Sequence, residues 1–92
     1  MSGRRIRTEE VLVYLGVRET RWIDDLRGEG LFESEELDPA QAEDLRLAKV
    51  LVEDLGVNPA GVEVALHLRR RLMALEHRAK VLARALEETR RD

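Results

Sequence analysis

Residues 38–59 read DPAQAEDLRLAKVLVEDLGVNP, and the start of this stretch carries a strong signal for the beginning of a helix. Asp38 can cap free backbone amides, while Pro39 has no amide that would need a partner in the first turn. Gln41 lies where a capping box places its second member. The stretch therefore predicts a helix that begins at Pro39.

The end of the same stretch predicts a corner and a new helix. Gly56 is typical of a helix end, and Asn58 with Pro59 repeats the pairing of a cap residue and a proline. The helix after Pro39 has apolar residues at steps of three and four, which indicates one buried face. These residues are Leu45, Ala48, Leu51, Val52 and Leu55.

Two shorter helices are predicted in the first third of the chain. Thr8 is a candidate N-cap with acidic residues after it, and Gly16 fits the left-handed position that stops a helix. A second apolar face follows with Trp22, Ile23 and Leu26, and this pattern ends near Gly28. Two short helices joined by a tight turn suggest a helix-turn-helix.

The composition agrees with a small all-α protein. The 92 residues are 43% apolar, 3% aromatic and 38% charged, which is enough for one compact domain and favours helix over sheet. Without cysteine, neither a disulfide framework nor a thiolate zinc site can stabilise the fold. No apolar run approaches the roughly 20 residues that span a bilayer, so we expect a cytoplasmic protein with no membrane partner.

The helix that begins at Pro59 is predicted to continue to about Thr89, over roughly 45 Å. Its second half carries a narrow apolar seam with alternating steps of four and three, which is typical of a coiled coil. Because a buried large aliphatic side chain is worth about 1.5–3 kcal/mol, the seam predicts a homodimer whose helix orientation stays open. The seam consists of Leu68, Leu72, Leu75, Ala79, Leu82 and Leu86.

These patterns divide the chain into three parts. Residues 1–7 are expected to form a flexible arm and residues 8–58 a helical domain. Residues 59–92 are expected to form one long helix, whose first half packs on the domain and whose second half dimerises.

The three consecutive arginines from Arg69 to Arg71 project about 100° apart on a helix. We therefore interpret them as solvated side chains that pair with Glu76 or with acids of a partner chain.

Residues suited to catalysis are scarce. His67 and His77 are ten positions apart with no metal-binding motif around them, and the serines have no neighbouring base. We therefore expect a binding protein without enzymatic activity, cofactor or metal.

The most distinctive electrostatic feature is an acidic segment in the middle of the chain. The net charge is only −3, but residues 28–61 contain nine acidic and two basic residues, and none of the basic ones lies between Gly28 and Leu45. Such a segment repels phosphate, which argues against nucleic acid as a partner.

Several of these residues resemble a known family. Leu15-Gly16-Val17, Trp22-Ile23 and Gly30-Leu31-Phe32 resemble the opening helix-turn-helix of MerR-type regulators. Residues 54–58, DLGVN, and residues 60–64, AGVEV, resemble two relatives of that fold. One relative is the HspR-type heat-shock repressor. The other is the chaperone modulator of the CbpM type, together with the DnaK–DnaJ assembly factor of the DafA type.

Loop length and charge favour the second relative. A MerR-type DNA-binding regulator needs a basic wing between its second and third helices. Here this span is only residues 33–37, ESEEL, and three of the five residues are glutamates: Glu33, Glu35 and Glu36. The chaperone-modulator resemblance implies a MerR-like fold without a wing that binds the J-domain of a DnaJ-type protein. It leaves open contact with Hsp70 (DnaK).

The resemblance and the charge pattern together give a set of candidate contact residues. J-domains present a basic helix, so the acidic side chains are expected to form an electrostatic surface for it, with one of two aromatic residues as an apolar anchor. The candidates are Glu33, Glu35, Glu36, Glu43 and Asp44, with Trp22 or Phe32 as the anchor. Two other interpretations remain: a dimeric HspR-type transcription regulator, and a helical oligomerisation module with an unrelated partner.

Overall fold

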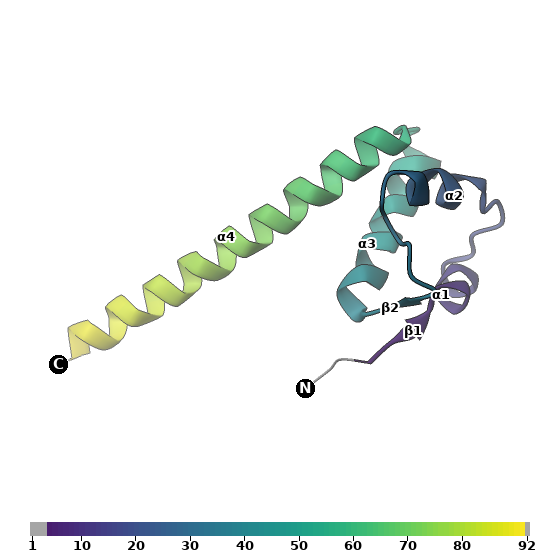
Figure 1. Cartoon of the computed structure of the whole chain (residues 1–92). Coiled ribbons are helices and arrows are strands. Elements are labelled where there is room, and N and C mark those ends of the chain that lie inside the picture. Colours follow the sequence, from purple (N-terminus) through teal and green to yellow (C-terminus); the bar gives the residue numbers. More distant parts are fainter. Residues whose placement is uncertain (1–3, 92) are drawn as a thin grey trace.

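A computed structural model describes residues 4–91, and the described chain is mainly helical (Figure 1). The expected all-α character is confirmed, with the addition of one small two-stranded sheet that the sequence patterns did not predict. The elements in chain order are β1 (Ile6–Arg7), α1 (Thr8–Leu15), α2 (Arg21–Gly28), β2 (Glu36–Leu37), α3 (Pro39–Lys49), the π-helical segment η1 (Val50–Asp54) and α4 (Pro59–Arg91).

The start of the described chain departs from the expected flexible arm. Ile6 and Arg7 form β1, which pairs antiparallel with β2 so that Ile6 faces Leu37. Residues 1–3 of the expected arm lie outside the described residues. Thr8 is also not the N-cap of α1, because that position belongs to Arg7. The Thr8 hydroxyl is buried and donates to the carbonyl of Ser34 at 3.1 Å, so it ties two distant segments together instead of capping a helix.

The two predicted starts at Pro39 and Pro59 are confirmed. Asp38 accepts the Gln41 amide at 2.8 Å while the Gln41 side chain accepts the Asp38 amide at 3.0 Å, which completes the capping box. Asn58 accepts the amide of Gly61 at 2.7 Å at the beginning of α4. These side chains satisfy amides that a helix end would otherwise leave without a partner.

The helix that begins at Pro39 changes at Val50 from α-helical geometry to the wider π-helical geometry. Val50–Asp54 form a π-helical segment, in which the Leu55 amide donates to the carbonyl of Val50 at 3.2 Å. Gly56 then adopts a left-handed conformation with φ of 66°, and the chain turns sharply into α4. Propensity and periodicity carry no signal for a π-helical turn, which explains why the sequence predicted an ordinary α-helix here.

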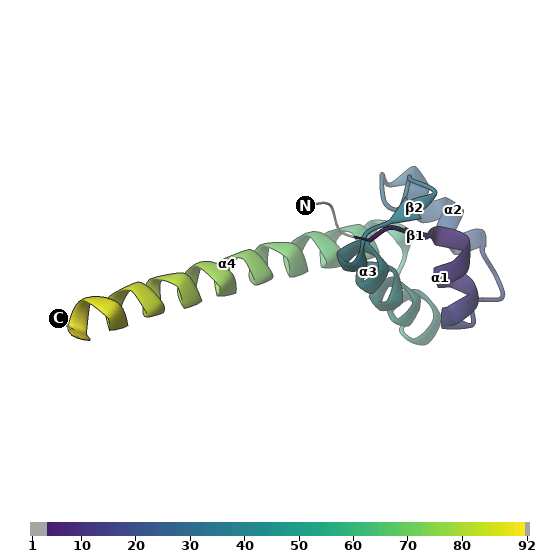
Figure 2. The same cartoon turned by 90° about the horizontal axis from the view of Figure 1, so that it is seen from below.

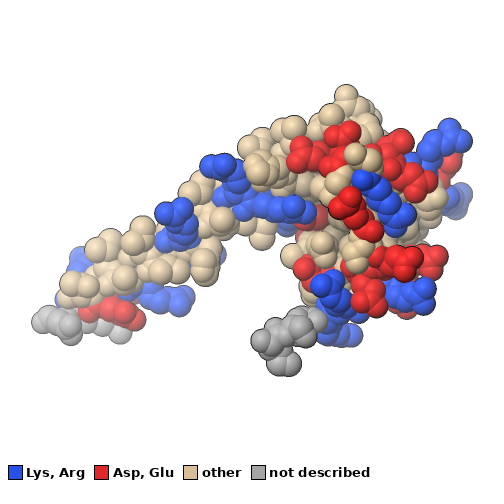
Figure 3. All heavy atoms as spheres, viewed as in Figure 1, with Lys and Arg blue, Asp and Glu red and all other residues tan. Residues whose placement is uncertain are grey.

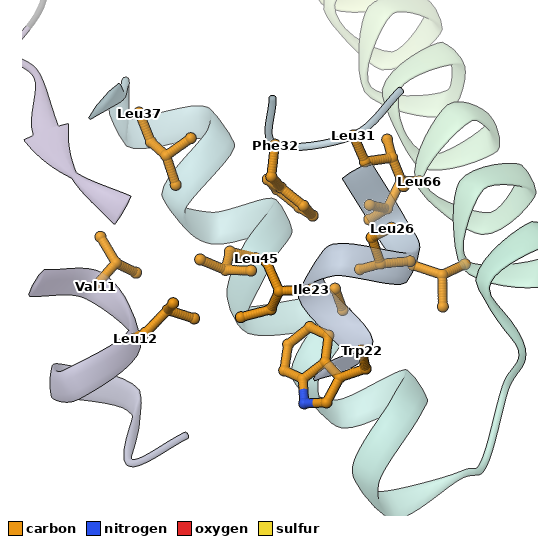
Figure 4. Close-up of a cluster of buried hydrophobic side chains, with 12 residues drawn as sticks. Val11, Leu12, Trp22, Ile23, Leu26, Leu31, Phe32, Leu37, Leu45 and Leu66 are labelled. Carbon is orange, nitrogen blue, oxygen red and sulfur yellow. The ribbon is translucent and has the colours of Figure 1, made fainter. Parts of the chain in front are cut away.

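The hydrophobic core collects side chains from α1, α2, α3, the loop after α2 and the first turns of α4 (Figure 4). Ile23 and Leu26 of α2 lie at its centre against Leu45 of α3, and all three are almost fully buried. Helix α4 contributes Val62 and Leu66. The core thus joins the predicted short helices to the beginning of the long one, and we call this part, residues 4–70, the head.

Beyond the head, α4 continues as a single straight extension (Figures 1 and 2). The 33 residues of α4 span about 50 Å, and the molecule measures 58 × 28 × 21 Å. Side chains from Arg71 to Arg90 are exposed. We call the part of α4 from Arg71 onward the stalk.

Candidate functional site

The segment between α2 and α3 presents acidic side chains at the surface of the head. Glu33, Glu35 and Glu36 are all exposed, and we call residues 33–36 the acidic loop. In the view of Figure 3, acidic side chains gather over the head, whereas α4 carries mainly basic ones along the side that is seen. The charge separation along the sequence therefore becomes a separation in space between head and stalk.

The backbone of the acidic loop is tied to the head by hydrogen bonds from two other elements. Arg27 Nε of α2 donates to the carbonyl of Phe32 at 3.1 Å, just before the loop. At the start of α1, Thr8 donates twice: its hydroxyl to the carbonyl of Ser34 at 3.1 Å and its amide to the carbonyl of Glu35 at 2.8 Å. The last residue of the loop, Glu36, already belongs to β2, which pairs with β1. Its carboxylates thus project from a fixed backbone.

The two aromatic residues considered as apolar anchors are core residues instead. Trp22 and Phe32 are both buried in the cluster that holds the head together (Figure 4), so neither is available to a partner. The Trp22 indole donates to Glu53 of η1 at 3.2 Å, which satisfies its polar atom. Phe32 has a positive φ of 54°, and this unusual turn inserts its ring into the core while the chain continues outward into the acidic loop.

Asp44 also does not belong to the predicted acidic surface, because it is only 3% exposed. Its carboxylate accepts hydrogen bonds from two arginines of α4: Arg69 Nη1 at 2.8 Å, and Arg70 through Nη2 at 2.8 Å and Nε at 3.1 Å. Arg69 and Arg70 therefore pair with Asp44 and not with Glu76 as predicted, while the Arg70 side chain stays 53% exposed. Although neighbouring helical positions diverge by about 100°, two long side chains converge on one acceptor placed between them.

Glu43, the neighbour of Asp44, lies on the outer side of α3. It forms an ion pair with Arg46 one turn later, with hydrogen bonds from Arg46 Nε at 3.1 and 3.0 Å. These hydrogen bonds and the charge of Arg46 lower the pKa of Glu43. The pair leaves less net charge at this position than the sequence suggested, so the acidic surface is centred on residues 33–36.

The predicted coiled-coil seam lies along one exposed side of α4. Its leucines are each more than half exposed: Leu68, Leu72, Leu75, Leu82 and Leu86. Ala79 completes the row and is exposed as well. Side chains two positions apart on an α-helix point in directions about 200° apart. Leu66 enters the core, so Leu68 points away from the core. The seam therefore begins beside the head and faces away from it.

A further surface feature had no counterpart in the sequence analysis. An apolar groove of about 540 Å³ lies between α1, α3 and β1, and Tyr14 borders it with 89% of its surface exposed. Val13 and Tyr14 are off the apolar face that α1 turns to the core through Val11 and Leu12. The signal in the sequence that could have indicated this groove is Tyr14, an aromatic residue outside the apolar face of a short helix.

Within residues 4–91, no group of three histidine or acidic side chains is arranged to hold a metal ion, and none of the helices there is long and apolar enough to cross a membrane. Comparisons with protein-family models, with curated proteins and with solved structures found no match for the chain.

Proposed function

We propose that this protein is a non-enzymatic binding module that recognises a DnaJ-type J-protein through the acidic loop and so regulates or scaffolds the Hsp70 (DnaK) system. The observation that carries the proposal is the fixed backbone of the loop, held by Thr8 and Arg27. A mobile acidic loop would lose conformational entropy when a partner orders it, whereas a fixed loop has already lost it. Exposed carboxylates on such a loop suit a rigid basic helix.

The chemistry of the partner follows from the charge of this surface. Glu33, Glu35 and Glu36 carry three negative charges within four residues, and none of them forms an ion pair among the described residues. A basic partner would be attracted over about a Debye length of 8–10 Å at ordinary ionic strength. The J-domain helix implied by the chaperone-modulator resemblance has this character.

We further propose that the functional unit is a homodimer formed along the α4 seam, within a MerR-like arrangement of helices. Five leucines that are more than half exposed at heptad spacing support a helical partner of the same kind. The dimer leaves the acidic loop free, because the seam faces away from the head.

The alternative, a DNA-binding regulator of the HspR type, has weaker support from the same geometry. Of the arginines around α2, Arg27 is already engaged by Asp24 and by the Phe32 carbonyl. A MerR-type regulator would need a basic wing between its second and third helices, and the segment between α2 and α3 here carries the acidic loop instead. We therefore favour a protein partner over nucleic acid.

The test is calorimetric titration of the protein with the J-domain, and separately with Hsp70, from the same organism at two salt concentrations. We expect micromolar or tighter binding to the J-domain that weakens with salt. The double variant Glu35→Lys/Glu36→Lys should weaken it at least about tenfold. The matched control is Glu87→Lys/Glu88→Lys at the far end of the stalk, which makes the same change in net charge and should leave affinity unchanged. Equal effects of the two variants, or no binding by the wild type, would contradict the proposal.

A further inference from the structure

The groove between α1 and α3 is apolar in its walls and open to solvent. Its walls come from Ile6 of β1, from Val11, Tyr14 and Leu15 of α1, and from Pro39 and Ala42 of α3. Its volume of about 540 Å³ lies within the range of about 300–1,000 Å³ that is common for ligand sites. The groove can therefore receive several apolar side chains without a rearrangement of the head.

Tyr14 is left uncovered at the edge of this groove. The other two aromatic residues, Trp22 and Phe32, are buried in the core, whereas Tyr14 is 89% exposed. Tyrosine combines a large apolar ring with a polar tip and is enriched among the residues that dominate the affinity of protein interfaces. Tyr14 thus has the chemistry of the apolar anchor for which Trp22 and Phe32 were the candidates from sequence.

The charges around the groove indicate what kind of partner fits. Three charged residues line its rim: Glu10, Glu43 and Arg46. Glu43 and Arg46 form an ion pair with each other, whereas Glu10 forms none among the described residues, so the charge that remains at the rim is negative. On the other side of β1 lies the acidic loop: Ile6, a wall of the groove, pairs with Leu37, and Arg7 pairs with Glu36. Since paired strands are about 4.8 Å apart, the groove and the acidic loop border the same two-stranded sheet.

We propose that this groove binds the apolar face of a basic amphipathic helix, with Tyr14 as the anchor and the acidic side chains facing the partner's lysines and arginines. The inference rests on the proposed function and extends it, because it assigns the J-domain's basic helix a second contact, apolar in character. Helix recognition of this kind places apolar residues at i, i+4 and i+7 in a groove, over about 10 Å of helix. The acidic loop then supplies attraction and orientation, and the groove supplies most of the affinity.

Two neighbouring residues provide a matched test. Tyr14 borders the groove and Val13 does not, although both are exposed on α1. Tyr14→Ala should weaken J-domain binding at least about tenfold while leaving its salt dependence unchanged, because no charge is removed. Val13→Ala should bind as the wild type does. Circular dichroism of both variants should match the wild type, since neither side chain contributes to the core.

A second measurement separates this inference from the proposed function. Amide shifts of the labelled protein are followed by NMR while a Leu/Lys amphipathic helical peptide is added, with a Leu/Glu peptide of the same apolar pattern as control. We expect shifts around Tyr14 and Ala42 with the first peptide and none there with the second. Shifts without J-domain binding would support the groove and contradict the J-protein assignment.

Three outcomes would overturn the groove inference. The first is J-domain binding that Tyr14→Ala and Val13→Ala leave equally strong, in which case the acidic loop acts alone. The second is the absence of peptide-induced shifts around the groove. The third is a change of sedimentation mass in Tyr14→Ala, which would make a second copy of this chain the occupant.

Discussion

The contact between Asp44 and the two arginines of α4 gives the sharpest stability prediction. Asp44→Asn keeps the size of the side chain and removes the charge that three guanidinium hydrogen bonds share. Removing one partner of a buried ion pair costs about 3–5 kcal/mol. Here the Arg69 and Arg70 side chains are 30% and 53% exposed and can regain water, so we reduce the expected loss to about 2–3 kcal/mol.

For a chain of this size, 1 kcal/mol shifts the melting temperature by about 4–8 °C, so Asp44→Asn should lower it by about 10–20 °C. The measurement is thermal unfolding followed by circular dichroism at one fixed protein concentration, because the stability of the proposed dimer would depend on concentration. The control is Glu43→Gln, one residue away in an exposed ion pair, which should leave the melting temperature nearly unchanged. A melting temperature for Asp44→Asn within about 2 °C of the wild type would refute the view that this ion pair holds α4 on the head.

Three further predictions concern the stalk, the helical glycines and the exposed ion pair. Leu75→Asp with Leu82→Asp should yield a monomer in sedimentation, and an unchanged mass would contradict the coiled coil. Gly28→Ala should stabilise the protein by about 0.5–1 kcal/mol, because the added carbon meets no atom within 4 Å in a helix. Gly61→Ala should destabilise it in the same denaturation assay, because that carbon would lie 2.7 Å from Val57 Cγ1. Because Arg46 lowers the pKa of Glu43, this contact adds stability above the ordinary glutamate pKa and loses it as the pH falls through the lowered value. NMR titration should give Glu43 a pKa below the ordinary range for glutamate, and Arg46→Gln should raise this pKa back toward the ordinary range.

Local signals in the sequence predicted the helices well. Asp38 with Gln41 and Asn58 with Pro59 mark the starts of α3 and α4, and Gly16 ends α1 with a φ of 75°. Each of these signals depends on a few consecutive residues and their own backbone groups, so no knowledge of the tertiary structure is needed.

The features that sequence reasoning missed all depend on residues far apart in the chain. Thr8 has the features of an N-cap, but its hydroxyl bonds a carbonyl 26 residues later. Asp44 looks like one more surface acid until α4 brings two arginines to it from 25 and 26 residues away. Trp22 could be an anchor or a core residue from its spacing alone, and only the packing of α2 against η1 decides between the two.

The opposite placement of the seam and the core contacts on α4 has a consequence for valency. The proposed coiled coil along the seam would place one head on each outer side, so that the dimer would carry two copies of the acidic loop and of the apolar groove. If each copy of the proposed site binds one partner molecule, the proposed dimer would hold two partner molecules at once. Binding of the second becomes a matter of local concentration, and avidity can rise without any new contact.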